Sequence, residues 1–168
     1  MTKSTNIKLV LVAGAAALIA PALAPASAQQ VDLYGNLGYT QYDGNNVNPG
    51  AVTGRIGANF GKYFAVEGEA STGVKKDNGV KIQNEFGAFG VAKLPITDRF
   101  DIFARAGVTT TNISAPGAGT RADEAFAYGA GGQYFFTDKD GLRLDWTKND
   151  FNHGGDVDTY AASYVRKF

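Results

Sequence analysis

The chain has 168 residues, with 16 basic and 16 acidic side chains, one histidine and no cysteine. The balanced charge gives no electrostatic case for nucleic-acid binding, and the lack of cysteine excludes a disulfide framework. Gly, Phe and Tyr are frequent, at 22, 11 and 8 residues. Because Leu and Ile are sparse, this composition favours strands over a helix bundle.

Residues 1–28 predict a cleavable Sec-type signal peptide. Lys3 and Lys8 precede an apolar run over 9–20, and a small-x-small motif closes the segment at 26–28. A helical membrane anchor is the alternative, but the apolar run is too short to span a bilayer. We therefore expect a signal peptide at 1–28.

Cleavage between Ala28 and Gln29 would leave residues 29–168 as a single domain. Only two basic residues and no acidic ones are removed, so 14 basic and 16 acidic side chains remain. After residue 28 no apolar run approaches the ~18 residues of a spanning helix. This excludes a helical inner-membrane protein.

The domain contains eight stretches that favour strands, separated by polar or Gly- and Pro-containing segments. The predicted strands are 31–42, 51–60, 63–73, 80–93, 100–111, 124–136, 142–151 and 157–168. The alternation over 80–93 is irregular, so its two faces stay unassigned. Short turns are expected at 61–62, 94–98 and 137–141, and four more polar connections at the other side. The longest of these four is predicted at 112–123, which is rich in Gly, Ala and Pro.

The last strand shows the pattern that decides the fold class. Tyr160, Tyr164 and Phe168 share one large face, and the opposite face is small and mostly polar. In a soluble sandwich the large face would point to a core, whereas in a transmembrane barrel it points to lipid. With a signal peptide and an even strand number, we predict an all-β, eight-stranded antiparallel up-and-down transmembrane β-barrel. A periplasmic sandwich or lipocalin-like barrel is the alternative fold.

Six charged residues fall on the polar face of their strands. They are Arg55, Glu67, Glu69, Arg105, Arg143 and Asp145. On the lipid face near the midplane, each Arg would cost about 2–4 kcal/mol. An eight-stranded lumen is only wide enough to be filled by side chains, so we expect these residues to face inward and to pair as a plug. An ion path gated by rearranging pairs is the alternative.

The chain resembles the small outer-membrane β-barrel proteins of Gram-negative bacteria, the OmpA-like superfamily. The signal peptide, the hairpin at 131–151 and the terminal strand that ends in Phe168 carry the resemblance. In that family the barrel assembly machinery reads the terminal strand, favouring a final aromatic and a large apolar residue two before it. Tyr160, Tyr164 and Phe168 match this assembly signal, but Arg166 departs from it. The family's frequent peptidoglycan-binding domain is not expected, because the chain stops at Phe168.

Aromatic residues near the strand ends are predicted to form two interfacial girdles. The outer candidates are Tyr39, Tyr42, Tyr128 and Trp146, and the periplasmic candidates are Phe60, Tyr63, Phe100, Phe136 and Phe168.

Other motifs do not support catalysis, cofactor binding or a metal site. His153 lies in a Gly-rich segment, and the nearest following serine, Ser163, is expected to face the lumen. The segment 138–141 resembles part of a calcium loop but has Thr147 where the bidentate Glu should be. The glycines of 129–132 lack the third glycine of a dinucleotide fingerprint, and they are expected to make room in a narrow lumen.

The sequence thus predicts a non-enzymatic outer-membrane barrel that contributes to envelope integrity or surface interaction, with its lumen plugged by charged side chains. A small nonspecific porin-like channel is the alternative function. Expected partners are outer-membrane lipid and the barrel assembly machinery, with an unidentified partner at the surface loops, and the barrel is expected to be a monomer.

Overall fold

The computed structural model describes residues 31–44, 48–77, 79, 81–115, 119–152 and 155–168. These residues form eight strands that pair with their neighbours in chain order, all antiparallel. The strands are β1 (Val31–Asp43), β2 (Gly50–Phe60), β3 (Phe64–Lys75), β4 (Lys81–Pro95), β5 (Phe100–Ala115), β6 (Gly119–Phe135), β7 (Asp140–Phe151) and β8 (Asp156–Lys167). The predicted strand number and antiparallel arrangement are confirmed.

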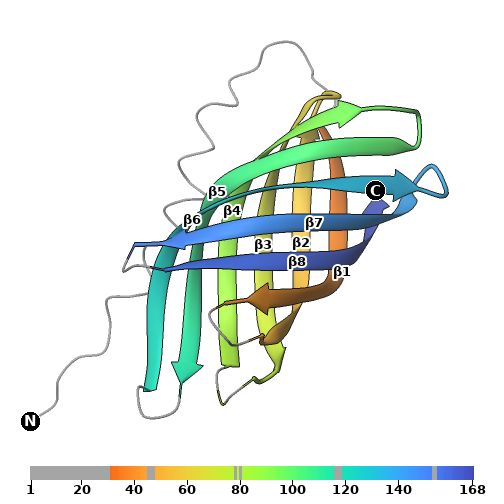
Figure 1. The fold of residues 1–168 in the computed structure, drawn as a ribbon. Helices are drawn as coiled ribbons and strands as arrows, with labels where there is room; N and C mark the ends of the chain where they lie inside the picture. Colours follow the sequence, from red (N-terminus) through yellow and green to blue (C-terminus); the bar gives the residue numbers. More distant parts are fainter. Residues whose placement is uncertain (1–30, 45–47, 78, 80, 116–118, 153–154) are drawn as a thin grey trace, which may run out of the picture.

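Pairing of the first strand with the last closes the sheet into a barrel (Figure 1). The β1–β8 ladder runs from Tyr34 opposite Lys167 to Asp43 opposite Asp158. The N–H of Phe168 also donates to the carbonyl oxygen of Leu33 at 3.0 Å, so the last residue is tied to the first strand. A closed barrel leaves no sheet edge along these ladders.

We call the end of the barrel where β3, β5 and β7 begin the turn end, and the end where β2, β4, β6 and β8 begin the loop end. The connections at the turn end are 61–63, 96–99 and 136–139. Gly61 has a φ of 73°, a left-handed conformation that glycine adopts without a steric penalty. In the 136–139 turn, the Thr137 hydroxyl accepts hydrogen bonds from the backbone N–H groups of Lys139 and Asp140.

Period-2 alternation separates an outer and an inner face on each strand. Leu37, Ile56 and Leu144 on the outer face are more than 60% exposed, whereas Asn36, Arg55 and Arg143 on the inner face are buried. The large apolar face therefore points away from the lumen.

The prediction of a long connection at 112–123 is wrong. β5 continues to Ala115 and β6 begins at Gly119, with ladder pairs from Asn112 opposite Ala122 to Ala115 opposite Gly119. Pairing of β5 with β6 continues through this segment and overrides its loop-like content of Gly, Ala and Pro. Smaller corrections are that β3 continues to Lys75, and that β4 includes Leu94 and Pro95 as its last two residues.

The unassigned strand, β4, contains a β-bulge that accounts for its irregular pattern. Ile82 pairs with Ile113 and Asn84 pairs with Asn112, so Gln83 is one extra residue on β4. The bulge shifts the alternation by one position, and both Ile82 and Glu85 are buried inside the barrel. A strict period of two cannot fit both sides of this shift.

The described residues contain no helix long and apolar enough to cross a membrane.

Candidate functional site

The barrel interior holds a network of charged side chains that come from four strands. All six charged residues expected to face inward are buried there: Arg55 on β2, Glu67 and Glu69 on β3, Arg105 on β5, and Arg143 and Asp145 on β7. Each lies on the inner face because the outward neighbours in its strand are apolar or small. The alternation within each strand places these side chains on the inner face, and the closure of the barrel brings them together.

Glu69 is shared by two arginines. Its Oε2 atom accepts hydrogen bonds from Arg55 Nε at 2.5 Å and from Arg105 Nη2 at 2.7 Å. Arg55 and Glu69 are direct partners in the β2–β3 ladder, whereas Arg105 reaches across from β5.

Asp145 is in contact with all three arginines. Arg55 places Nη1 and Nη2 at 3.2 Å from its two oxygens, and Arg143 Nε lies 3.0 Å from Oδ1. Arg105 Nη1 lies 3.7 Å from Oδ2, within ion-pair range but beyond a hydrogen bond. The bond between Arg55 and Asp145 joins β2 to β7, which are not neighbours, so it crosses the lumen.

Glu67 forms the third part of the network. Arg143 contacts both of its oxygens, with Nη1 at 2.5 Å from Oε1 and Nη2 at 3.2 Å from Oε2. Such a bidentate pair has the geometry that fits a guanidinium to a carboxylate best. The hydroxyl of Tyr34 donates to Oε1 at 2.7 Å, which adds β1 to the network. Three arginines and three carboxylates thus balance in charge, as a group buried in this way requires.

Aromatic rings cover two of the guanidinium groups. Arg105 lies 3.5 Å from the ring centroid of Phe89, and Arg143 lies 4.0 Å from that of Phe103. Guanidinium groups stack on aromatic faces more readily than ammonium groups, so these contacts suit Arg at both positions.

Inward glycines give these large side chains their space. A Cβ atom on Gly57 would lie 2.2 Å from Tyr34 Cζ, and one on Gly131 would lie 2.5 Å from Phe103 Cζ. A Cβ on Gly129 would lie 2.1 Å from the carbonyl oxygen of Trp146. Gly131 therefore makes room for Phe103 in the lumen, as predicted, whereas Gly129 allows a close approach of the β7 backbone.

A second buried acid, which the sequence pattern did not predict, lies toward the loop end. Glu85 accepts hydrogen bonds from the Tyr42 hydroxyl at 3.1 Å and from the Thr111 hydroxyl at 2.6 Å. No ion pair joins Glu85 to a cation within the described part of the chain. The bulge in β4 concealed this residue, because the alternation before it puts position 85 on the outer face.

The prediction of Tyr42 as an outer-girdle residue is wrong. Tyr42 is 3% exposed and packs in the lumen with Ala51 and Ile82, and its hydroxyl bonds to Glu85. In the alternation of β1, Tyr42 falls on the same face as the inward residues Asn36 and Thr40. The prediction followed its aromatic character instead of this alternation.

Two apolar clusters lie inside the barrel on either side of the ion network. The first consists of Tyr34, Ala65, Val91, Phe103, Phe135 and Val165, and belongs to the turn end. The second consists of Tyr42, Ala51 and Ile82, with Val157 packed against it, and belongs to the loop end. The lumen is thus layered along its axis.

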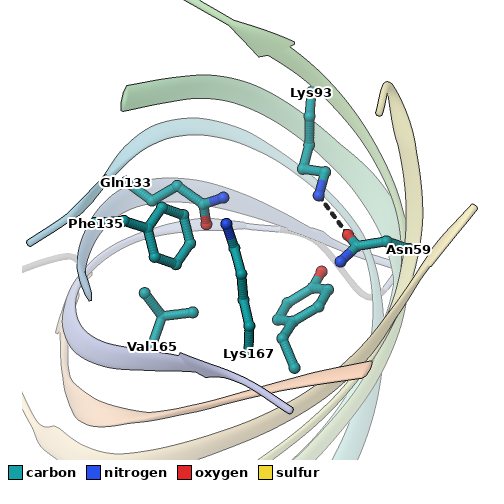
Figure 2. A pocket seen from close by; sticks show the side chains of 7 residues that line it. Asn59, Lys93, Gln133, Phe135, Val165 and Lys167 are labelled. Atoms are coloured by element: carbon teal, nitrogen blue, oxygen red, sulfur yellow. Dashed lines mark hydrogen bonds between the residues drawn. The ribbon is translucent and has the colours of Figure 1, made fainter. Parts of the chain in front are cut away.

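A small pocket opens at the turn end. It is lined by Tyr34, Asn59, Lys93, Gln133, Phe135, Val165 and Lys167 (Figure 2). Its cavity volume of about 10 Å³ is room for about one water molecule. Within the described residues, no group of three or more His, Cys, Asp or Glu side chains is arranged to hold a metal ion.

The remaining predicted residues lie as follows. Tyr160, Tyr164 and Phe168 are all exposed on the outer face of β8 and at its end. Trp146 donates to Asp158 Oδ1 at 2.8 Å, and its ring meets that of Tyr128 edge-on with centroids 6.3 Å apart. The predicted cleavage position at Ala28 and Gln29, and the histidine at 153, lie outside the described residues.

Ser163, the serine considered with His153, faces the lumen. It is 6% exposed, and its hydroxyl has no hydrogen-bond partner among the described atoms. The segment 138–141 covers the end of the 136–139 turn and the first two residues of β7, and the Thr137 hydroxyl donates to Asp140 Oδ2 at 3.0 Å.

A comparison with known families identifies the barrel. The model of the outer membrane protein beta-barrel domain matches residues 10–168. The chain belongs to this family. It is therefore an outer-membrane protein with transmembrane strands, and the exposed apolar face of the barrel contacts lipid.

Solved structures of outer-membrane barrels share the fold at low sequence identity. The N-terminal β-barrel domain of OprF from Pseudomonas aeruginosa is 14% identical, with a TM-score of 0.65, over 83% of this chain and 100% of that one. OprG from the same organism is 10% identical, with a TM-score of 0.65, over 83% and 97%. Ail, the attachment invasion locus protein of Yersinia pestis, in complex with the heparin analogue sucrose octasulfate, is 15% identical, with a TM-score of 0.60, over 83% and 99%. Among curated proteins, none matches the chain significantly.

Proposed function

We propose that this outer-membrane barrel is a non-enzymatic envelope protein whose lumen is plugged by its own side chains. The observation that carries the proposal is the network of three arginines and three carboxylates that bridges the lumen from β2 and β3 to β5 and β7. Apolar clusters on both sides of the network support it, because a hydrated ion would have to pass through them as well. The protein then acts through its presence in the membrane or through its surface rather than through transport.

Planar-bilayer conductance of the folded protein tests this proposal. Folding is checked first by a heat-dependent gel shift, and Glu67→Gln is measured beside the parent protein. The plugged barrel predicts a silent bilayer for the parent. Steady current steps that change in Glu67→Gln would contradict the plug and favour a channel.

A small porin-like channel is the second candidate, and unsatisfied polar atoms inside the barrel favour it. Asn36 on β1, Thr147 on β7 and Ser163 on β8 each have a buried side-chain polar atom with no hydrogen-bond partner among the described atoms. Buried groups of this kind usually bind water. Hydration along these three adjacent strands would provide a path beside the ion network.

A role in surface interaction is supported by the longest hairpin. β5 and β6 have 16 and 17 residues, and their pairing continues to Ala115 and Gly119 at the loop end. In outer-membrane barrels the end opposite the short turns is extracellular. Exchange of residues 112–123 for an unrelated hairpin of equal length should abolish surface binding while the gel shift of the folded barrel persists. Unchanged binding would show that the surface interaction uses a different connection at the loop end.

A role in envelope integrity makes a different prediction. Loss of the protein should increase the sensitivity of cells to detergent, and the 112–123 exchange variant should restore resistance because it still folds. If that variant does not restore resistance, the hairpin is necessary for envelope integrity as well as for surface interaction.

We further propose that the barrel is a monomer assembled by the barrel assembly machinery through its terminal strand. The outward Tyr160, Tyr164 and Phe168 support assembly by this machinery, because it favours such aromatics in this family. Phe168→Ala should reduce the heat-modifiable fraction in membranes, while Phe136→Ala, in an adjacent turn, should not.

A further inference from the structure

The pocket at the turn end contains two lysines and no acidic residue in its lining. Lys93 comes from β4 and Lys167 from β8, and Figure 2 shows their side chains reaching into the pocket from different sides. The remaining polar atoms of the lining are the amides of Asn59 and Gln133 and the Tyr34 hydroxyl. The lining therefore supplies positive charge and hydrogen-bond donors without a carboxylate.

Aromatic rings and one amide hold the two ammonium groups in place. Lys93 Nζ donates to Asn59 Oδ1 and lies 5.6 Å from the centroid of the Tyr34 ring. Lys167 Nζ lies 3.6 Å from the centroid of the Phe135 ring. Neither lysine forms an ion pair with an acid in the described part of the chain. Each ammonium has three donors, so donors on both stay available to a ligand.

The nearby acids do not occupy this site. Asp101 lies outside the lining, and its Oδ2 atom accepts a hydrogen bond from Gln133 Nε2 at 2.8 Å, so this carboxylate already has an amide partner. Asp32, opposite Asn59 in the β1–β2 ladder, is exposed at the rim. Deeper in the lumen, Glu67 is already bound by Arg143 and Tyr34.

We propose that this pocket is a binding site for a small oxyanion, a carboxylate or a phosphate group. The cavity of about 10 Å³ admits about one oxygen atom, so the group would enter end-on with one oxygen near the two ammonium groups. The turn end of an outer-membrane barrel faces the periplasm, so the ligand is a periplasmic anion. The site does not depend on whether the lumen conducts.

Nuclear magnetic resonance of the folded full-length domain in detergent micelles tests the proposal. Sodium acetate, sodium phosphate and N-acetylalanine are titrated separately at constant ionic strength, while the side-chain amide signals of Asn59 and Gln133 are followed. Acetate represents a free carboxylate, and N-acetylalanine carries the same group at the end of a peptide unit. The variants are Lys93→Gln and Lys167→Gln, and Lys62→Gln in the 61–63 turn is the matched control outside the pocket.

Saturable shifts of both amide signals with acetate or phosphate are expected in the parent protein and in Lys62→Gln. The dissociation constant should rise at least about tenfold in each pocket variant, since a charged donor is removed. An equal response to N-acetylalanine would identify chain ends as a further source of the anion. Shifts that do not saturate, or that persist in both pocket variants, would overturn the site. Lys167 lies near the rim of the barrel, so Lys167→Gln is used for the test if Lys93→Gln fails to fold.

Discussion

Two regions of the same lumen bury acidic side chains in different surroundings. The central network surrounds Glu67, Glu69 and Asp145 with three arginines, and the charges cancel. Toward the loop end, Glu85 is buried as deeply as Glu67, but its hydrogen-bond partners are two hydroxyl groups, from Tyr42 and Thr111. The stability of the first region requires all of its arginines and carboxylates. The second region requires only the hydrogen bonds around Glu85.

This difference predicts at which lumen positions a substitution destabilises the barrel most. Removing one partner of a buried ion pair leaves an uncompensated charge, and the cost is large. Replacing a buried acid that has no cation partner leaves no opposite charge unpaired, so the cost is small. Stability measurements along the lumen should therefore separate the two regions.

The largest effect is expected for Arg143→Met. This side chain is 1% exposed and contacts both Glu67 and Asp145, so its loss leaves two carboxylates without their shared partner. We expect a loss of about 3–5 kcal/mol in the free energy of unfolding, measured by urea titration in lipid vesicles.

Arg166→Met is the matched control, because Arg166 pairs with Asp140 on the exposed surface. Its effect should stay below about 1 kcal/mol. The double variant Glu67→Gln with Arg143→Met should be less destabilised than the two single effects combined, with a coupling of about 0.5–3 kcal/mol. Additive effects would show that the pair does not act as a unit.

An intermediate effect is expected for Gly57→Ala. The new methyl group would lie 2.2 Å from Tyr34 Cζ, and Tyr34 is held by its bond to Glu67. Overpacking of this kind costs about 1–3 kcal/mol in the free energy of unfolding. Gly54→Ala on the same strand is the control, since its Cβ would meet no atom within 4 Å. Equal effects at the two positions would contradict the tight packing around Tyr34.

The smallest effect is expected for Glu85→Gln. Glutamine keeps an oxygen that accepts from one hydroxyl, its amide donates to the other, and no cation is left without a partner. The free energy of unfolding should change by less than about 1 kcal/mol or increase. Glu67→Gln, measured in parallel, should be clearly destabilising. If the two variants lose equal stability, the two regions do not differ as described.

Three predictions made from the sequence failed for identifiable physical reasons. A single extra residue, Gln83, reverses the alternation in β4, so the pattern could not identify Glu85 as an inward acid. Tyr42 was assigned to the outer girdle from its residue type, although the parity of its strand placed it inside. In the 112–123 segment, pairing of β5 with β6 overrode a composition typical of loops. In β4 and in the 112–123 segment, pairing with a neighbouring strand decided what local composition could not, whereas for Tyr42 the alternation of its own strand already indicated the inner face.

The sequence by itself determined the number of strands and which face of most of them is polar, because alternation with a period of two is a local property. Only the tertiary structure decided which arginine meets which acid. Arg55 and Asp145 are 90 positions apart and lie on strands that are not neighbours. Their heights in the lumen follow from the register of every ladder between them and from the closure of β1 on β8. The stagger of the strands, which sets these heights, is a property of the closed barrel as a whole.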